Sequence, residues 1–296
     1  MIFVALILLL LSAGAALAAR GISVTKDVIY GKTTEGRPLR MYIYEPEGLG
    51  SCAPAFISVH GGAWIEGDLE GNAEFAVFIA ELGFKVFDVE YRLSREARWP
   101  AQIEDCKTAV RHVRANYREY GIDPGRIMAG GISAGGHLAC MLGVVPEGKY
   151  EGGGWTWASS SVQAVLNIVG PADLRYYRDP EILATNVNSR AFIDWIDALV
   201  PDTRGDYREM LADMSPVSYA RPGLCPHLNM YGGIDNVVMY QMGEDYTKLL
   251  DKAGVPNTLL VAEGIWHEFS EEMRQATREF CRDFIEEKGF FDPLGK

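Results

Sequence analysis

Short apolar segments alternate along this chain with segments in which apolar residues recur every three or four positions. The first pattern predicts strands buried on both faces, and the second predicts amphipathic helices. Strands and helices that alternate in this way form a mostly parallel sheet with helices on both faces. The sequence therefore predicts an α/β protein, and such sheets bind ligands at the carboxyl ends of their strands.

The clearest helix begins at Pro100 and ends at Gly121, because its apolar residues are spaced by three or four positions. A hairpin is predicted before it, in which two short strands flank a turn at residues 35–38. The strands are expected at residues 24–30, 39–44, 55–60, 84–91, 126–129, 162–169, 227–231 and 258–261, and the further helices at residues 73–82, 138–145, 242–250 and 269–284.

Residues 171–225 have mixed polarity, several aromatic side chains and no clear strand. We interpret this segment as a lid-like excursion between two strands of the sheet. No stretch within residues 24–296 has the composition of an interdomain linker. The sequence therefore predicts a single domain over residues 19–296.

The N-terminal 19 residues carry no charged side chain, and Ile2 to Leu11 are almost purely aliphatic. Ala16-Leu17-Ala18 fits the small residues of a signal-peptidase site, which predicts a signal peptide over residues 1–18 and a secreted or periplasmic protein. No lysine or arginine precedes the apolar run, and a run of about 18 apolar residues can span a bilayer. An uncleaved membrane anchor is therefore the alternative.

The charge balance argues against nucleic acid as a partner, because 28 Lys and Arg against 40 Asp and Glu leave a net charge of −12. The five cysteines include no CxxC pair, so neither a zinc site nor a metal or organic cofactor is expected. Cys106 and Cys281 lie on or beside apolar helical stripes and are predicted to be core residues. Cys52 and Cys225 lie in loops that contain proline, and a disulfide between them stays open.

Gly131-Ile132-Ser133-Ala134-Gly135 forms a G-x-S-x-G motif between an apolar run and a predicted helix. In this position a serine sits on a strained strand-to-helix turn that projects its Oγ above the sheet. The flanking glycines let neighbouring backbone approach closely, and the helix N-terminus favours developing negative charge. The motif therefore predicts Ser133 as a nucleophile.

A serine nucleophile needs a base, and the base needs an orienting carboxylate. His267 follows the predicted strand 258–261 and so lies at a strand's carboxyl end, which makes it the expected base. His112 and His227 fit structural roles, and His137 follows Ser133 too closely along the chain to act as its base.

Asp235 leaves the strand 227–231 through two glycines and is the expected orienting carboxylate. The competing acids are interpreted as surface charges or as poorly placed for this role: Asp173, Asp202, Asp206, Asp213, Glu263 and Glu268.

A second glycine-containing loop, His60-Gly61-Gly62-Ala63-Trp64, follows a buried strand. Small residues expose their backbone N–H groups, and such groups stabilise the negative charge of a tetrahedral intermediate. An ordinary glycine turn is the alternative for this loop if it is considered alone.

These motifs together resemble the hormone-sensitive-lipase-like branch of the α/β-hydrolases, and within it the carbohydrate, acetyl and feruloyl esterases of bacteria. The resemblance is carried by His60-Gly61-Gly62-Ala63-Trp64, Tyr91-Arg92-Leu93-Ser94, Trp99-Pro100-Ala101 and Gly131-Ile132-Ser133-Ala134-Gly135-Gly136-His137. It implies an α/β-hydrolase fold and the order Ser133, Asp235, His267 for the triad. It also implies that Gly62, Ala63 and Ala134 donate the oxyanion-hole N–H groups, and that Tyr91, Arg92 and Leu93 support the structure.

The expected function is that of a serine carboxylesterase that hydrolyses short-chain or carbohydrate-linked esters, of the acetyl or feruloyl type, through an acyl-enzyme. Its expected partner is a small-molecule or carbohydrate-linked ester, with a membrane involved only if the N-terminal segment stays uncleaved. The alternatives are an arylformamidase or a prolyl-oligopeptidase-like peptidase of the same fold, or a non-catalytic esterase-like binding protein.

Overall fold

The computed structural model describes residues 21–185, 189–201 and 206–286. Within these residues, eight strands form one sheet in the order β1-β2-β4-β3-β5-β6-β7-β8. The strands are β1 (Ile22–Lys32), β2 (Pro38–Pro46), β3 (Ala53–Val59), β4 (Lys85–Val89), β5 (Ile122–Ile132), β6 (Ala164–Ile168), β7 (His227–Gly232) and β8 (Asn257–Ala262). β2 pairs antiparallel with β1 and β4, and the strands from β4 to β8 are mutually parallel, so the predicted α/β class is confirmed.

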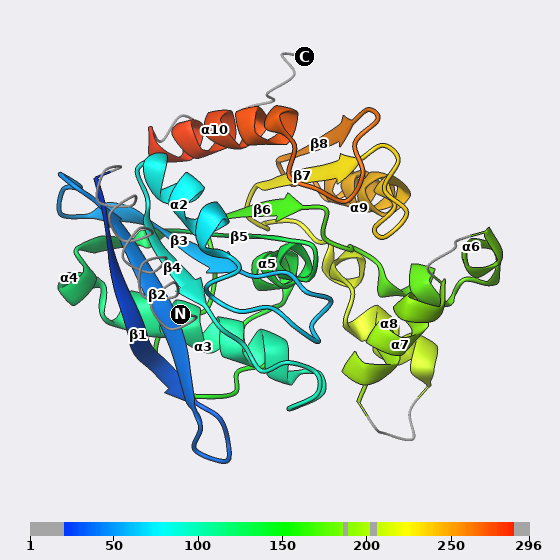
Figure 1. Ribbon diagram of the computed structural model, residues 1–296, viewed down its shortest axis with the longest axis horizontal. Helices are drawn as coiled ribbons and strands as arrows, with labels where there is room; N and C mark the ends of the chain where they lie inside the picture. The colour runs from blue at the N-terminus through cyan, green and yellow to red at the C-terminus, as the bar shows by residue number, and fades with distance from the viewer. Residues whose placement is uncertain (1–20, 186–188, 202–205, 287–296) are drawn as a thin grey trace, which may run out of the picture.

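Helices cover both faces of this sheet (Figure 1). They are α2 (Ala73–Glu81), α3 (Ala101–Ala115), α4 (Tyr117–Tyr120), α5 (Ala134–Val144), α9 (Tyr240–Lys252) and α10 (Glu271–Ile285). Successive residues of a strand point to opposite faces, so Phe56 of β3 packs in the core beneath α2 and α10 while Ile57 packs with α3, α5 and α9. The sheet is therefore buried on both sides, as its continuous apolar strands predict.

The predicted hairpin is confirmed, and both of its strands are longer than the sequence pattern indicates. The helix predicted from Pro100 to Gly121 is interrupted, so that prediction is partly wrong. The backbone of Asn116 leaves the helical conformation (φ −100°, ψ 22°), which ends α3 before the short α4 begins, and its side-chain amide donates to the His112 carbonyl. Gly121 then ends α4 in the left-handed conformation (φ 63°), which glycine adopts readily.

The segment 171–225 contains no strand among its described residues. It holds the 3₁₀ turns η1 (Leu174–Arg178) and η2 (Pro216–Tyr219) and the helices α6 (Pro180–Thr185), α7 (Ser189–Leu199) and α8 (Tyr207–Asp213). In Figure 1 these helices lie beyond the end of the sheet, on the side to which β5, β6 and β7 point. The segment therefore stands beside the carboxyl ends of the central strands.

None of the described helices is long and apolar enough to cross a membrane. The predicted signal peptide, residues 1–18, lies outside the described residues.

Candidate active site

Ser133 is the single residue between the end of β5 and the start of α5. Its backbone has φ 57° and ψ −122°, a conformation that costs a residue with a Cβ free energy of order 1–3 kcal/mol. Its N–H donates to the Ile168 carbonyl at 2.8 Å, which holds the turn against β6. The strand–turn–helix predicted from the motif is therefore present, and α5 begins four residues earlier than expected.

Gly131 and Gly135 have to be glycine because the backbone of Val59 lies very close to both. A Cβ on Gly131 would lie 2.3 Å from the Val59 carbonyl oxygen, and one on Gly135 would lie 2.0 Å from the same atom. Real Cβ atoms do not come so close, so only glycine allows the turn to pack on the end of β3.

The three residues predicted as a triad meet in one chain of hydrogen bonds. His267 Nδ1 lies 2.7 Å from Asp235 Oδ2, and His267 Nε2 lies 2.9 Å from Ser133 Oγ. Because a carboxylate only accepts, Nδ1 carries the proton and Nε2 is free to accept from the serine hydroxyl. Asp235 Oδ1 accepts from the N–H groups of Val237 and Val238, so both carboxylate oxygens are held.

Two loops after neighbouring strands bring Asp235 and His267 together. Asp235 follows β7, His267 follows β8, and the Ile234 N–H donates to the Ile265 carbonyl at 3.0 Å. The Asp235 side chain is fully buried, while that of His267 keeps 16% exposure. The imidazole is therefore held on one side by a fully buried carboxylate and stays partly exposed on the other.

The HGGAW loop, residues 60–64, runs directly past the serine. A Cβ on Gly61 would lie 2.9 Å from the Ile132 carbonyl oxygen and 3.5 Å from Ser133 Cβ. Three successive residues have positive φ: Gly62 at 109°, Ala63 at 49° and Trp64 at 61°. The loop is therefore a strained backbone turn that passes beside the serine.

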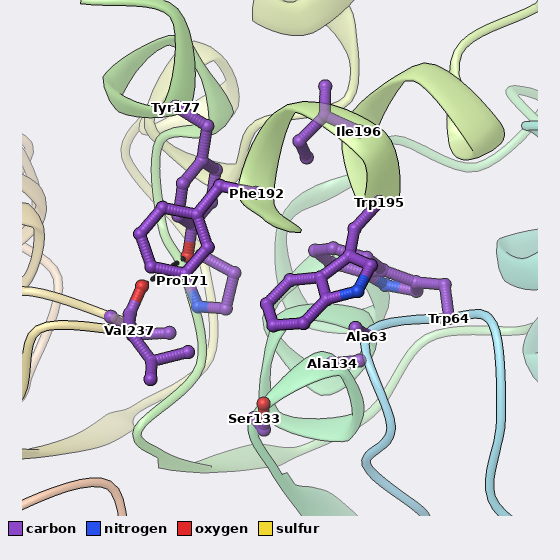
Figure 2. Close-up of a pocket in the computed structure, with 11 residues that line it drawn as sticks. Ala63, Trp64, Ser133, Ala134, Pro171, Tyr177, Phe192, Trp195, Ile196 and Val237 are labelled. Carbon is purple, nitrogen blue, oxygen red and sulfur yellow. Dashed lines mark hydrogen bonds between the residues drawn. The ribbon is translucent and has the colours of Figure 1, made fainter. Parts of the chain in front are cut away.

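A small pocket opens beside Ser133. It is lined by Ala63, Trp64, Ser133, Ala134, Pro171, Tyr177, Phe192, Trp195, Ile196, Val237 and Val238. In Figure 2 the side chains from η1 and α7 close the pocket opposite the serine, and the Tyr177 hydroxyl donates to the Val237 carbonyl. The pocket is almost entirely apolar, which suits a hydrocarbon or aromatic group rather than a charged one.

Ala63 and Ala134 line this pocket together with Ser133, whereas Gly62 does not. Gly62 instead borders a more open depression, together with Glu66 and Asp68. Trp64 belongs to the HGGAW motif, but the aromatic residues that the lid-like segment adds to the pocket, Tyr177, Phe192 and Trp195, were not identified from the sequence. The amphipathic stripe of α7 is a local signal for the last two.

The Tyr91-Arg92 segment contacts both the HGGAW loop and helix α3. The Tyr91 ring stacks on the His60 ring at 4.2 Å, and its hydroxyl donates to the His60 carbonyl. The Arg92 guanidinium binds both carboxylate oxygens of Asp105 at 2.8 Å. This segment has the supporting role that the resemblance implies.

The competing acids lie elsewhere. Asp173 caps η1 and pairs with Arg175, Asp206 caps α8, and Asp213 binds Lys149 and Tyr150. Glu263 and Glu268 are exposed, and Asp202 lies outside the described residues.

Three buried histidines away from the reaction centre have depressed pKa values. Burial lowers the pKa of His112, His137 and His227 to about 4 each. Burial also raises the pKa of the Asp88 carboxyl to about 7, although Asn72 donates a hydrogen bond to it. The three histidines are therefore neutral near neutral pH, and the Asp88 carboxyl becomes mostly protonated below about pH 7.

The five cysteines are all free thiols. Cys106 and Cys281 are buried in the core, as predicted, and the disulfide considered between Cys52 and Cys225 is not formed. Over the described ranges, no group of three or more His, Cys, Asp or Glu side chains is placed to hold a metal ion.

A mostly parallel sheet, a serine on the turn after its central strand, and an acid and a histidine after later strands define an α/β-hydrolase. Solved structures of esterases with this fold agree with the arrangement. The family model described as BD-FAE matches residues 41–250, so the chain belongs to the BD-FAE family. That match includes Ser133 and Asp235 and ends before His267.

Two curated relatives are esterases of Mycobacterium tuberculosis. Esterase LipC is 30% identical over 202 residues, which cover 67% of this chain and 48% of LipC. The probable carboxylic ester hydrolase LipM is 28% identical over 225 residues, covering 76% of this chain and 51% of LipM. The chain therefore spans about half the length of the curated relatives it matches.

Two solved structures align with this chain over nearly the whole length of both proteins. A truncated carbohydrate esterase from gut microbiota aligns with a TM-score of 0.75 and 27% identity. The alignment covers 89% of this chain and 96% of the esterase chain. Esterase Est2 of Thermogutta terrifontis has a TM-score of 0.71 and 27% identity, covering 93% and 95%.

Proposed function

We propose that this protein is a serine carboxylesterase that works through an acyl-enzyme. The observation that carries the proposal is the hydrogen-bonded chain Asp235–His267–Ser133 beneath an apolar pocket. The esterase names of its relatives support the same reaction class.

The reaction follows from the geometry. Ser133 Oγ attacks the ester carbonyl carbon while His267 Nε2 takes the hydroxyl proton, and Asp235 stabilises the resulting imidazolium. The carbonyl oxygen, now negatively charged, would accept from the N–H groups of Ala63 and Ala134, with Gly62 as a further donor from the same loop. His267 then gives its proton to the leaving alcohol, and water attacks the acyl-enzyme by the same route.

The pocket beside Ser133 would hold the acyl group, since its walls are apolar and closed by aromatic side chains. The apolar walls would contact a short acyl chain or an aromatic ring. We therefore propose short-chain or feruloyl-type esters as substrates, with a carbohydrate as one form of the alcohol. The gut carbohydrate esterase among the structural neighbours favours that form.

The test is a panel of p-nitrophenyl acetate, p-nitrophenyl butyrate, methyl ferulate, an aryl formamide and a proline p-nitroanilide. We expect turnover of the esters, and loss of that turnover by a factor of at least about 10⁴ in Ser133→Ala, with unchanged thermal unfolding. Paraoxon should add one diethyl phosphate to Ser133 and none to the variant, as mass spectrometry would show. Preferential cleavage of the formamide or the anilide would identify an amide hydrolase instead.

A non-catalytic binding role would be indicated if purified wild-type protein neither hydrolyses any member of the panel nor reacts with paraoxon.

We also propose export, because residues 1–19 are uncharged and end in a small-x-small site. Protein expressed at full length in a bacterial host should be recovered outside the cytoplasm with Ala19 at its N-terminus, as N-terminal sequencing would show. An intact Met1 in the membrane fraction would show an uncleaved anchor instead.

A further inference from the structure

The HGGAW loop depends on contacts that oppose its backbone strain. Ala63 and Trp64 both have positive φ, which residues with a Cβ avoid. The backbone contributes two kinds of contact: the Ile65 and Glu66 N–H groups donate to the Gly62 carbonyl, and the Ser94 N–H donates to the Trp64 carbonyl. Tyr91 holds the His60 end of the loop, and the Trp64 side chain, which is 3% exposed, anchors the other end.

That side chain ends on a buried histidine. The Trp64 indole Nε1–H donates to His137 Nδ1 at 3.2 Å, and the two rings meet edge to face at 5.1 Å. His137 is completely buried and stands one helical turn after Ser133 on α5, where its own N–H donates to the Ser133 carbonyl. One residue therefore contacts both the helix that follows the serine and the loop that passes it.

The second ring nitrogen of His137 reaches the lid-like segment. Nε2 lies 2.7 Å from the carbonyl oxygen of Met214, the residue that ends α8. A carbonyl only accepts and an indole N–H only donates, so Nε2 carries the proton and Nδ1 accepts. The contacts thus require one neutral tautomer, in which both ring nitrogens are used.

We propose that His137 is a positioning residue: its imidazole holds the Trp64 end of the HGGAW loop in register with Ser133 and ties both to the base of the lid-like segment at Met214. This inference rests on the proposed function, because the loop that His137 holds carries Ala63, whose N–H is proposed to bind the oxyanion. His137 itself does not line the pocket beside Ser133.

The first test compares His137→Leu, which cannot hydrogen-bond, with His137→Gln, whose amide can both accept from Trp64 and donate to Met214. With p-nitrophenyl acetate we expect His137→Leu to lower kcat by about 10²-fold, the effect of losing one oxyanion donor, while KM changes by less than about threefold. His137→Gln should recover kcat to within about tenfold of wild type.

His227→Leu is the matched control. His227 is also fully buried with a depressed pKa, but it bonds to the Cys225 carbonyl at the opposite end of β7. We expect this variant to be less stable than wild type while its kcat is unchanged. A kcat for His137→Leu equal to wild type, or a loss equal to that of His227→Leu, would overturn the positioning role.

A readout independent of turnover uses the indole N–H resonance of Trp64 in ¹⁵N–¹H spectra, assigned from its absence in Trp64→Phe. It should shift and exchange faster with solvent in His137→Leu, and stay near its wild-type position in His137→Gln and His227→Leu. An unmoved resonance in folded His137→Leu would refute the contact. If His137→Leu does not fold, unchanged kcat in Trp64→Phe, which removes the N–H donor together with part of the indole ring, would overturn the inference.

The proposed function fails separately, because it is tested by wild type against Ser133→Ala. Absence of esterase turnover in wild type would remove the catalytic meaning of His137, while the indole resonance would still decide whether the residue anchors the loop.

Discussion

At the scale of single residues, several positions around Ser133 tolerate only one kind of residue, because neighbouring backbone lies too close for any other. Ser133 tolerates positive φ because the turn is bonded to β6 on one side and packs on β3 on the other. Gly131 and Gly135 leave room for the Val59 carbonyl. The motif G-x-S-x-G is therefore a packing requirement as much as a chemical one.

Gly135→Ala tests that requirement. The new Cβ would lie 2.0 Å from the Val59 carbonyl oxygen, so backbone must move and the free energy of unfolding should fall by about 1–3 kcal/mol or more. Ester turnover should fall with it, because the displaced turn carries Ser133. Urea unfolding measures the change, with Gly50→Ala as the control, since Gly50 has open space around its Cβ position. Wild-type stability in Gly135→Ala would contradict the close approach.

At the scale of elements, helix α7 closes the pocket and is fixed at its C-terminal end. The Arg98 guanidinium donates to the carbonyls of Asp197 and Val200, each at 2.7 Å, and the Trp99 N–H donates to Leu199. A cation on the last carbonyls of a helix is favourable, because these groups have no partner within the helix. The pocket wall is therefore docked to the main domain by the segment just before α3.

Trp195→Ala tests whether this wall determines acyl preference. Removing the indole takes away apolar surface that would contact the end of a butyryl chain and leaves an acetyl group unaffected. We expect the ratio of kcat/KM for p-nitrophenyl butyrate over acetate to fall by about tenfold. Trp157→Ala is the control, since Trp157 is 75% exposed and does not line the pocket. An equal ratio in wild type and Trp195→Ala would place the acyl group elsewhere.

At the scale of the whole molecule, the two faces of the sheet bury ionisable groups that titrate far from their ordinary range. His112, His137 and His227 are neutral in the folded protein because burial lowers the pKa of each to about 4. In the unfolded chain a histidine titrates near pH 6.5. Their contribution to stability is therefore complete above pH 6.5 and is lost as the pH falls toward 4.

The histidines should accordingly lower the free energy of unfolding between pH 6.5 and 4, because the unfolded chain binds protons that the folded protein does not, while the raised pKa of Asp88 acts in the opposite direction. His227→Leu removes one of these groups, so its stability should depend less steeply on pH over the same interval. Urea unfolding of both proteins at pH 7, 6 and 5 measures the difference. Equal slopes in wild type and His227→Leu would show that His227 is not held neutral.

Local patterns were sufficient for much of the fold and for the triad. The apolar runs identified all eight strands, and Ser133, Asp235 and His267 were found because each follows a strand within a recognisable loop. The break of the long helix at Asn116 was missed, because the apolar spacing continues across it from Val113 to Tyr117. Trp195 was missed because the periodicity of a lid helix shows that one face is buried without showing what it is buried against.

The sequence by itself determined the class of fold and identified Ser133, Asp235 and His267, because the strand and loop patterns depend on neighbours a few positions away. Only the tertiary structure decided the pocket wall and the contacts of His137, which join residues 73 and 77 positions apart along the chain. Such contacts depend on how a segment without a regular pattern packs over the strand ends. No local spacing of residues specifies that packing.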